Sequence, residues 1–196
     1  MNHKKKQKIG LLGGNFNPIH HAHLMMADQV AQQMNLDKVF LMPENIPPHQ
    51  DTKTTISPNH RIKMIELALL DNPRLEIEKI EIKRGGKSFT YDTLKLLTAL
   101  HPENDYYFII GSDMVDYLEK WYKIDALIEM VHFVAIKRYE HQKESPYPVI
   151  WLDTPLLPIS STMIREMIAK KIEPNYLLPK AVLDYIHSHH LYEKKS

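Results

Sequence analysis

The chain has 196 residues and no cysteine, and its 25 lysines and arginines nearly balance its 24 aspartates and glutamates, so its formal net charge is +1 with the twelve histidines neutral. This balance argues against a dedicated nucleic-acid-binding protein, because such proteins use many cationic side chains to displace counterions from phosphates. The absence of cysteine excludes a disulfide framework, a thiolate zinc finger, an iron–sulfur cluster and a cysteine nucleophile. Metal binding through His, Asp or Glu stays open.

Hydrophobic residues make up 43% and charged residues 25% of the chain, the usual composition of a folded globular protein. Because a domain has about 100–200 residues, we expect residues 1–196 to form a single domain. The lysines within residues 1–8 lead directly into a short apolar run, which predicts a flexible basic end rather than a secretory leader. No apolar run approaches the roughly 18 residues that a membrane span needs, so we expect a soluble, cytoplasmic protein.

The first half of the chain alternates between strand and helix patterns. Residues 9–14 form a short apolar run that ends in glycines, and residues 38–43 form a second run that ends in proline. Between them, residues 22–34 carry apolar side chains at helical spacing. Ser57 and Pro58 form a typical helix start, with serine as the N-cap and proline at the first helical position.

The second half continues this alternation. The expected elements are a strand over 75–83, a helix over 90–100, strands over 106–110, 131–136 and 149–152, and helices over 161–170 and 179–188. Residues 44–57 and 139–148 are expected to be long loops, which are often functional in compact domains. Short apolar strands alternating with helices indicate an α/β fold, a doubly wound parallel sheet with helices on both faces. Such sheets bind ligands beyond the carboxyl ends of their strands, where the winding direction reverses.

The first candidate site follows the first expected strand. Gly13 and Gly14 allow a tight turn and a close approach of the backbone to a ligand. His20 and His23 lie on one face at the start of the next expected helix, where free N–H groups and the helix dipole favour a phosphate. The segment lacks both the P-loop ending and the dinucleotide-binding glycine pattern. A metal-binding histidine pair and histidines without any ligand stay open beside the phosphate site.

The second candidate site is the segment from Ile159 to Arg165. It places the hydroxyl groups of Ser160, Ser161 and Thr162 at another helix start, followed by the arginine. Hydroxyls, a free helix N-terminus and a guanidinium group are three adjacent means of holding phosphate. A hydroxyl-rich N-cap followed by a surface arginine is the alternative interpretation, and it is common.

Taken together, these two segments resemble the nucleotidylyltransferase superfamily, whose signatures are written HxGH and ISSTxxR. His20 and His23 match the first signature, and residues 159–165 match the second. The middle of the chain is similar to the bacterial nicotinate-mononucleotide adenylyltransferase family. The segments that carry this similarity are residues 88–94, residues 108–113, Trp121 and Tyr122. The resemblance extends from Ile9 to about Tyr185, nearly the whole chain.

The resemblance implies a Rossmann-like sheet of the nucleotidylyltransferase type. It also implies transfer of the adenylyl group of ATP to nicotinate mononucleotide, giving nicotinate adenine dinucleotide (deamido-NAD) and pyrophosphate in NAD biosynthesis. His20, His23 and Arg165 would be the catalytic residues. The residues implied to bind ATP are Gly13, Gly14, His20, His23, Gly111, Asp113, Ile159, Ser160, Ser161, Thr162 and Arg165. Mg²⁺ would accompany ATP, without a protein-bound metal cage.

The resemblance also implies an acceptor site. Its residues would be Asn15, Phe16, His49, Thr90, Tyr91, Trp121 and Arg138. The nicotinate ring would stack on Trp121, for which a core aromatic is the competing interpretation. The nicotinate carboxylate would meet backbone N–H groups near Thr90 and Tyr91, which agrees with the helix expected to begin there.

This chain departs from the family pattern at three places. Ala22 stands between the signature histidines, where glycine is commoner, and helical geometry tolerates this change. Gln50 occupies a position that is often lysine, which leaves His49 as the candidate contact in that loop. The residues after Arg138 also differ from the usual pattern.

Two other kinds of function remain open. One is a different enzyme of the superfamily, such as pantetheine-phosphate adenylyltransferase or a cytidylyltransferase acting on a phosphorylated alcohol. The other is a nucleotide-sensing module that binds ATP without turnover. In each case we expect small-molecule partners, no nucleic acid and no membrane, and a homo-oligomer stays open.

Overall fold

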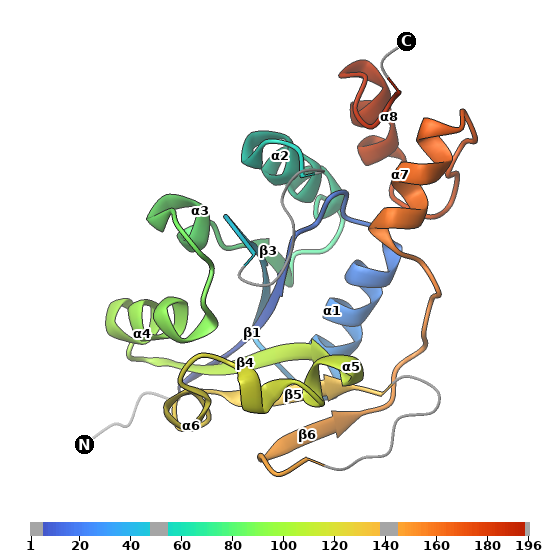
Figure 1. Ribbon diagram of the computed structural model, residues 1–196. Coiled ribbons are helices and arrows are strands. Elements are labelled where there is room, and N and C mark those ends of the chain that lie inside the picture. The colour runs from blue at the N-terminus through green and yellow to red at the C-terminus, as the bar shows by residue number, and fades with distance from the viewer. Residues whose placement is uncertain (1–5, 48–54, 138–144, 195–196) are drawn as a thin grey trace.

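The computed structural model describes residues 6–47, 55–137 and 145–194. Its centre is a six-stranded sheet in which every pairing is parallel (Figure 1). The strands are β1 (Gln7–Gly14), β2 (Lys38–Pro43), β3 (Leu75–Ile77), β4 (Asn104–Gly111), β5 (His132–Ile136) and β6 (Val149–Leu152). Their order is β3-β2-β1-β4-β5-β6, so the winding direction reverses between β1 and β4. The expected doubly wound α/β sheet is confirmed.

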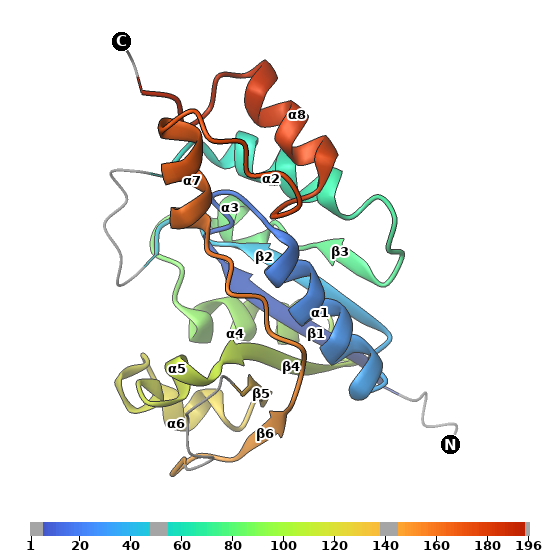
Figure 2. The same cartoon turned by 90° about the vertical axis from the view of Figure 1, so that its right-hand side faces the viewer.

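Helices cover both faces of this sheet (Figures 1 and 2). One face carries α1 (His21–Gln33), α2 (Pro58–Ala68), α7 (Ser161–Ala169) and α8 (Lys180–Ser188). The other carries α3 (Ile80–Arg84), α4 (Thr90–Leu100), α5 (Ser112–Val115), the 3₁₀ turn η1 (Leu118–Lys120) and α6 (Ile124–Leu127). Neighbouring residues of a strand pack on opposite faces of the sheet. Leu11 packs with the second set of helices, and Leu12 packs with the first. This alternation explains why the central strands are apolar throughout.

A glycine in the middle of β1 permits close packing of the first helical layer. A Cβ atom at Gly10 would lie 2.7 Å from Val39 Cγ2 and 2.9 Å from Leu36 Cδ1. Both distances are shorter than carbon atoms tolerate without movement of the neighbours. The side chains of Val39 and Leu36 therefore occupy the space that a larger residue would need.

The structure corrects two expectations about element boundaries. β1 begins at Gln7 rather than at Ile9, because Gln7 pairs with Asn104 of β4. The expected basic end is therefore shorter than residues 1–8, and residues 1–5 lie outside the described part of the chain. The expected strand over 75–83 is wrong beyond Ile77, where the chain turns into the short helix α3.

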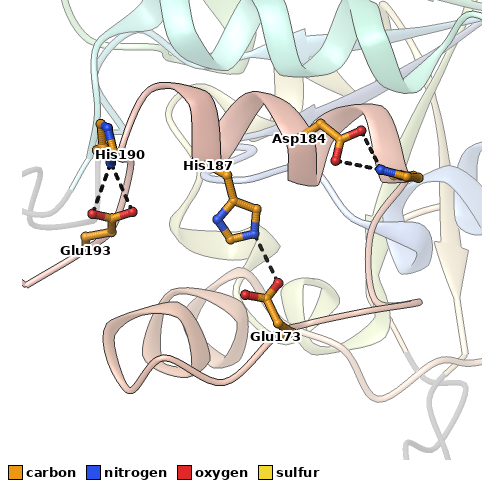
Figure 3. A network of polar contacts seen from close by, with 6 residues as sticks. Glu173, Asp184, His187, His190 and Glu193 are labelled. Carbon is orange, nitrogen blue, oxygen red and sulfur yellow. Dashed lines mark hydrogen bonds and ion pairs between the residues drawn. The ribbon is translucent and has the colours of Figure 1, made fainter.

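The C-terminal helix packs against α2 through its apolar face. Val182, Leu183 and Ile186 of α8 are buried in the same core cluster as the α2 residues Met64 and Ile65. Exposed polar pairs surround this helix (Figure 3). His187 Nε2 lies 3.0 Å from Glu173 Oε2, and His190 Nδ1 lies 3.3 Å from Glu193 Oε2. Such exposed pairs contribute little to stability, so apolar burial is what fixes α8 on the core.

Among the described residues, no helix is both long enough and apolar enough to cross a membrane.

Candidate active site

Two cavities lie beyond the carboxyl ends of the strands. The first, of about 440 Å³, is bordered by Gly13 and Gly14 at the end of β1 and by Gly111 at the end of β4. The second, of about 680 Å³, lies between the start of α1 and residues 154–161. His23 and Met26 line both cavities, so the two spaces meet at the first turns of α1. The site therefore occupies the reversal point that the sequence analysis indicated.

The signature histidines stack on one another at the start of α1. His20 is the N-cap, and its ring lies 3.7 Å from that of His23, centroid to centroid, with an interplanar angle of 22°. The backbone N–H of His20 donates to Nδ1 of His23 over 3.3 Å. Because Nδ1 of His23 accepts this bond, we assign its ring hydrogen to Nε2, which is left as a hydrogen-bond donor.

Both histidines are held in the neutral form. Burial, followed by the nearby charge of His21, lowers the pKa of His20 to about 4. Burial, followed by the charge of His20, lowers the pKa of His23 well below its ordinary value of 6.5. At neutral pH the two imidazoles can therefore donate hydrogen bonds to an anion without carrying positive charge themselves.

The loop between β1 and α1 is held by side chains from distant elements. Arg61 of α2 donates through Nη1 to the carbonyl oxygen of Asn15 over 2.9 Å. From α7, Ser161 Oγ donates to the carbonyl oxygen of Pro18 over 2.8 Å, and Arg165 Nη1 donates to that of Asn17 over 2.8 Å. Three carbonyl oxygens of this short loop thus accept hydrogen bonds from side chains of two helices, α2 and α7.

The start of α7 has the serine N-cap that the alternative interpretation of this segment describes. Ser160 is the N-cap, and its Oγ accepts a hydrogen bond from the backbone N–H of Met163 over 3.1 Å. Ile159, Ser160 and Ser161 line the second cavity. Thr162 and Arg165 do not line either cavity: Arg165 Nη2 donates to Thr162 Oγ1 over 3.2 Å, in addition to its bond to the β1–α1 loop. The second signature segment therefore lies beside the first, as expected of a common site.

Two of the predicted acceptor residues, Thr90 and Trp121, line the first cavity. Thr90, the first residue of α4, lines this cavity. Trp121 lines it too, while its ring packs edge-to-face at 5.9 Å on both Phe108 and Phe133. Trp121 therefore borders the cavity, where a ligand ring could stack on it, and also packs against core aromatics, as the competing interpretation holds. The ring of Tyr91 does not line the cavity and instead lies under the Lys123 ammonium group, 4.7 Å away.

The remaining predicted residues divide into three groups. Asn15, Gly111 and Asp113 line the first cavity. Phe16 has a positive φ of 48° and is 2% exposed, so its ring belongs to the core and does not border the cavity. His49 and Arg138 lie outside the described residues.

The sequence analysis missed a buried charged group beside the first cavity. Glu44, the first residue after β2, lines this cavity, and burial raises its pKa to about 7. The negative charge of Glu81 acts in the same direction, and the guanidinium of Arg61 acts against it. Arg61 is 1% exposed and Glu81 is 2% exposed.

Two sequence signals pointed to this group. Glu44 directly follows a strand end, which is where ligand-binding residues of such sheets gather. Arg61 shares the buried face of α2 with Met64 and Ile65, and a charged residue on an apolar helix face is a functional signal.

Tyr122, one of the residues that carry the family similarity, also lines the first cavity. Within residues 6–47, 55–137 and 145–194, no three His, Asp or Glu side chains lie close enough to hold a metal ion together.

The chain is similar to known proteins over nearly its whole length. Residues 11–167 match the cytidylyltransferase-like family. A protein of Lactococcus lactis named probable nicotinate-nucleotide adenylyltransferase is 69% identical over 195 residues, which cover 100% of both chains. A protein of the same name from Streptococcus mutans is 58% identical over 97% of this chain and 90% of its own.

A solved structure shares the fold. It is the nicotinic acid mononucleotide adenylyltransferase of Plasmodium falciparum complexed with NaAD, with a TM-score of 0.79 and 23% identity, covering 95% of this chain and 97% of that one. The full-length identity and the family match lead to one conclusion: the chain belongs to the nicotinate-nucleotide adenylyltransferase family of cytidylyltransferase-like proteins.

Proposed function

We propose that this chain transfers the adenylyl group of ATP to nicotinate mononucleotide, producing nicotinate adenine dinucleotide and pyrophosphate in NAD biosynthesis. The 69% identity over the full length with the L. lactis relative carries the proposal. The two cavities that meet at His23 support it, since a two-substrate transfer needs adjoining spaces for donor and acceptor.

The reaction joins an oxygen of the acceptor phosphate to the α-phosphorus of ATP and breaks the bond from that phosphorus to the bridging oxygen of the leaving pyrophosphate. A phosphate monoester with a second pKa of about 6 is mostly ionised at neutral pH, so no side chain has to deprotonate it. The work of the protein is alignment and stabilisation of the negative charge that moves onto pyrophosphate. Neutral histidines that donate hydrogen bonds suit this task, and a general base is not required.

The phosphate contacts follow from the two helix starts. His20 and His23 would donate to the ATP phosphates at the junction of the cavities. The free N–H groups of Ser161 and Thr162, at the start of α7 beside the second cavity, would hold the β- and γ-phosphates. Arg165, whose guanidinium lies outside both cavities in this structure, would join them by leaving Thr162 Oγ1. Arg165 also keeps its bond to the Asn17 carbonyl, which fixes one of its two terminal nitrogens and leaves the other near the start of α7.

Nicotinate mononucleotide would bind where Thr90 and Trp121 line the first cavity. The free N–H groups at the start of α4, from Thr90 and Tyr91, would bind the nicotinate carboxylate. The ring would stack on Trp121. Asn15 would contribute its side chain, whereas Phe16, with a buried ring, would contribute only its backbone.

The rest of the cavity would hold the adenosine part of ATP. Gly111 and Asp113, at the end of β4, would contact it, and Gly13 and Gly14 let the ligand approach β1 closely. Mg²⁺ would be bound chiefly by the phosphates of ATP and would neutralise part of their charge. A single domain, a cytoplasmic location, the absence of a nucleic-acid partner and the roles of His49 and Arg138 remain predictions.

The test is a pyrophosphate-release assay with ATP and a panel of acceptors. We expect release with nicotinate mononucleotide, and the amide mononucleotide in a parallel reaction measures the preference for the acid. Release with phosphopantetheine but not with nicotinate mononucleotide would reassign the enzyme within the superfamily. ATP binding without turnover on any acceptor would instead indicate a sensing module.

A further inference from the structure

A further external contact of the β1–α1 loop comes from the C-terminal segment. Tyr192 Oη donates to Oδ1 of Asn17 over 2.8 Å, across 175 residues of sequence. Asn17 is 2% exposed, so the acceptor of this bond is buried, whereas Tyr192 itself is partly exposed. The carbonyl of the same asparagine accepts the bond from Arg165. One residue thus joins the C-terminal segment to an arginine of the second signature.

The chain adopts unfavourable backbone conformations to place this tyrosine. After α8 ends, His190 and Tyr192 have positive φ angles of 50° and 66°, which cost free energy in residues with bulky side chains. Between them Leu191 is 8% exposed, and its N–H donates to the carbonyl of Ile186 over 3.0 Å. These contacts hold the turn that directs Tyr192 back toward the loop, and the exposed His190–Glu193 pair lies beside it (Figure 3).

The hydroxyl of Tyr192 stays a donor at any pH at which the protein works. Burial raises the pKa of Tyr192 above its usual range, although the guanidinium groups of Arg165 and Arg61 act in the opposite direction. These two arginines are the same ones that hold the Asn15 and Asn17 carbonyls. Tyr192 therefore lies close to both of the arginines that donate hydrogen bonds to the loop.

We propose that Tyr192 is a positioning residue of the triphosphate site. It fixes Asn17, whose carbonyl orients the guanidinium of Arg165, and the same loop leads through Pro18 into His20. This inference rests on the proposed function, because it takes Arg165 and His20 as ATP contacts. It goes beyond that function by assigning part of the ATP affinity to a hydroxyl that touches no substrate.

The test compares Tyr192→Phe with a matched control, Tyr185→Phe. Tyr185 belongs to α8, and its hydroxyl also makes one partly buried side-chain hydrogen bond, to His60 Nδ1 over 2.9 Å. That bond leads to α2 and not to the loop. Both variants lose one hydroxyl from the C-terminal part of the chain, and urea unfolding measures the stability cost of each.

The readout is the affinity for α,β-methylene-ATP, measured by calorimetry without an acceptor. We expect Tyr192→Phe to weaken this affinity about tenfold, because it removes one hydrogen bond to Asn17, the residue that holds Arg165. Tyr185→Phe should leave the affinity unchanged. In turnover assays, KM for ATP should rise by a similar factor, while KM for nicotinate mononucleotide stays within about twofold. Equal affinities in the two variants would overturn the proposal.

A second pair of variants tests whether Tyr192 acts through Asn17. In an Asn17→Ala background, adding Tyr192→Phe should cause no further loss of affinity, and a second full loss would contradict the proposed route. The analogue assay also separates this inference from the proposed function. Wild-type protein that binds the analogue but does not adenylylate nicotinate mononucleotide would refute the function and leave the positioning test valid. Failure of the wild type to bind the analogue would refute both.

Discussion

At the scale of single residues, the central feature is a pair of histidines kept neutral by burial. His23 has one ring nitrogen occupied by the backbone N–H of His20 and lines both cavities, so its other ring nitrogen is the donor left for a ligand. A donor fixed in this way needs no reorganisation as charge builds up on the phosphates, and that is the most effective form of electrostatic stabilisation. The arrangement differs from that of a histidine general base, which needs a pKa near the working pH.

We therefore expect His23→Ala to lower kcat by about two to three orders of magnitude. The reason is the loss of the Nε2 donor where the cavities meet. The measurement is steady-state turnover together with circular dichroism, which should show an intact fold. His101→Ala is the control, since His101 lies at the exposed end of α4, far along the chain from both signatures. Unchanged turnover in the His23 variant would remove this residue from the mechanism.

Glu44 provides a second prediction at this scale. Its pKa is raised from 4.5 to about 7 in the folded protein, so between these values the folded state retains a proton that the unfolded state releases. Stability from this group is fully present below pH 4.5 and is lost as the pH rises through 7. The full change in pKa, from 4.5 to about 7, corresponds to about 3–4 kcal/mol at about 1.4 kcal/mol per pKa unit. Because part of this stability is already lost at pH 5, Glu44→Gln should gain about 2–3 kcal/mol of stability relative to wild type between pH 5 and pH 8.

Urea unfolding at several pH values measures this difference. The exposed Glu129→Gln is the control and should follow the wild-type pH profile. Parallel pH profiles of wild type and Glu44→Gln would show that Glu44 is ionised normally in the folded protein.

At the scale of elements, the residues that cap the start of α7 also belong to the proposed phosphate site. Ser160→Ala removes the Oγ that accepts from Met163 and should lower the free energy of unfolding by about 1 kcal/mol. Ser160→Asn retains a capping oxygen and should recover most of that loss. Thermal and urea unfolding of the two variants measure the effect, and equal destabilisation by alanine and asparagine would show that the cap is not what stabilises α7.

Most elements were predictable from periodicity, and the exceptions have physical causes. The helix at Thr90–Leu100 and the strands at Lys38–Pro43 and Val149–Leu152 have the expected bounds, because each has a clear pattern between turn residues. The strand expected over 75–83 ends early since β3 lies at the sheet edge and pairs only with β2. The helices α5 and α6 have four residues each, too few for a helical period to be read.

The site was predictable only where it is local in sequence. Both signatures were found because each is a short segment at a helix start, and the structure places them side by side. Glu44 and Arg61 each carried only a weak local signal, a strand end and a charge on an apolar helix face, and their interaction joins distant parts of the chain. Tyr192 escaped notice because its importance arises from a contact 175 residues away. A tyrosine near the C-terminus has no local pattern that distinguishes it from a packing residue.

At the scale of the whole molecule, ligand binding and folding are linked through the strands that border the site. β1 and β4 are central in the sheet, and the loops that follow them line the first cavity. A ligand that binds only the folded chain stabilises it by about 2.7 kcal/mol at 100 times its Kd. We expect α,β-methylene-ATP to raise the unfolding midpoint accordingly in wild type. Arg165→Ala should show a much smaller rise at the same concentration, and an equal rise would argue against a phosphate contact by this arginine.

The long-range contacts of the β1–α1 loop also have a consequence for the synthesis of the chain on the ribosome. A ribosome produces residues 15–18 early, yet their partners lie at positions 61, 161, 165 and 192. The nascent chain can pair β1 with β2 long before Tyr192 has left the exit tunnel, but the loop cannot acquire its full set of contacts until then. If this contact positions the ATP site as proposed, a chain that ends before Tyr192 should bind ATP more weakly than the full chain.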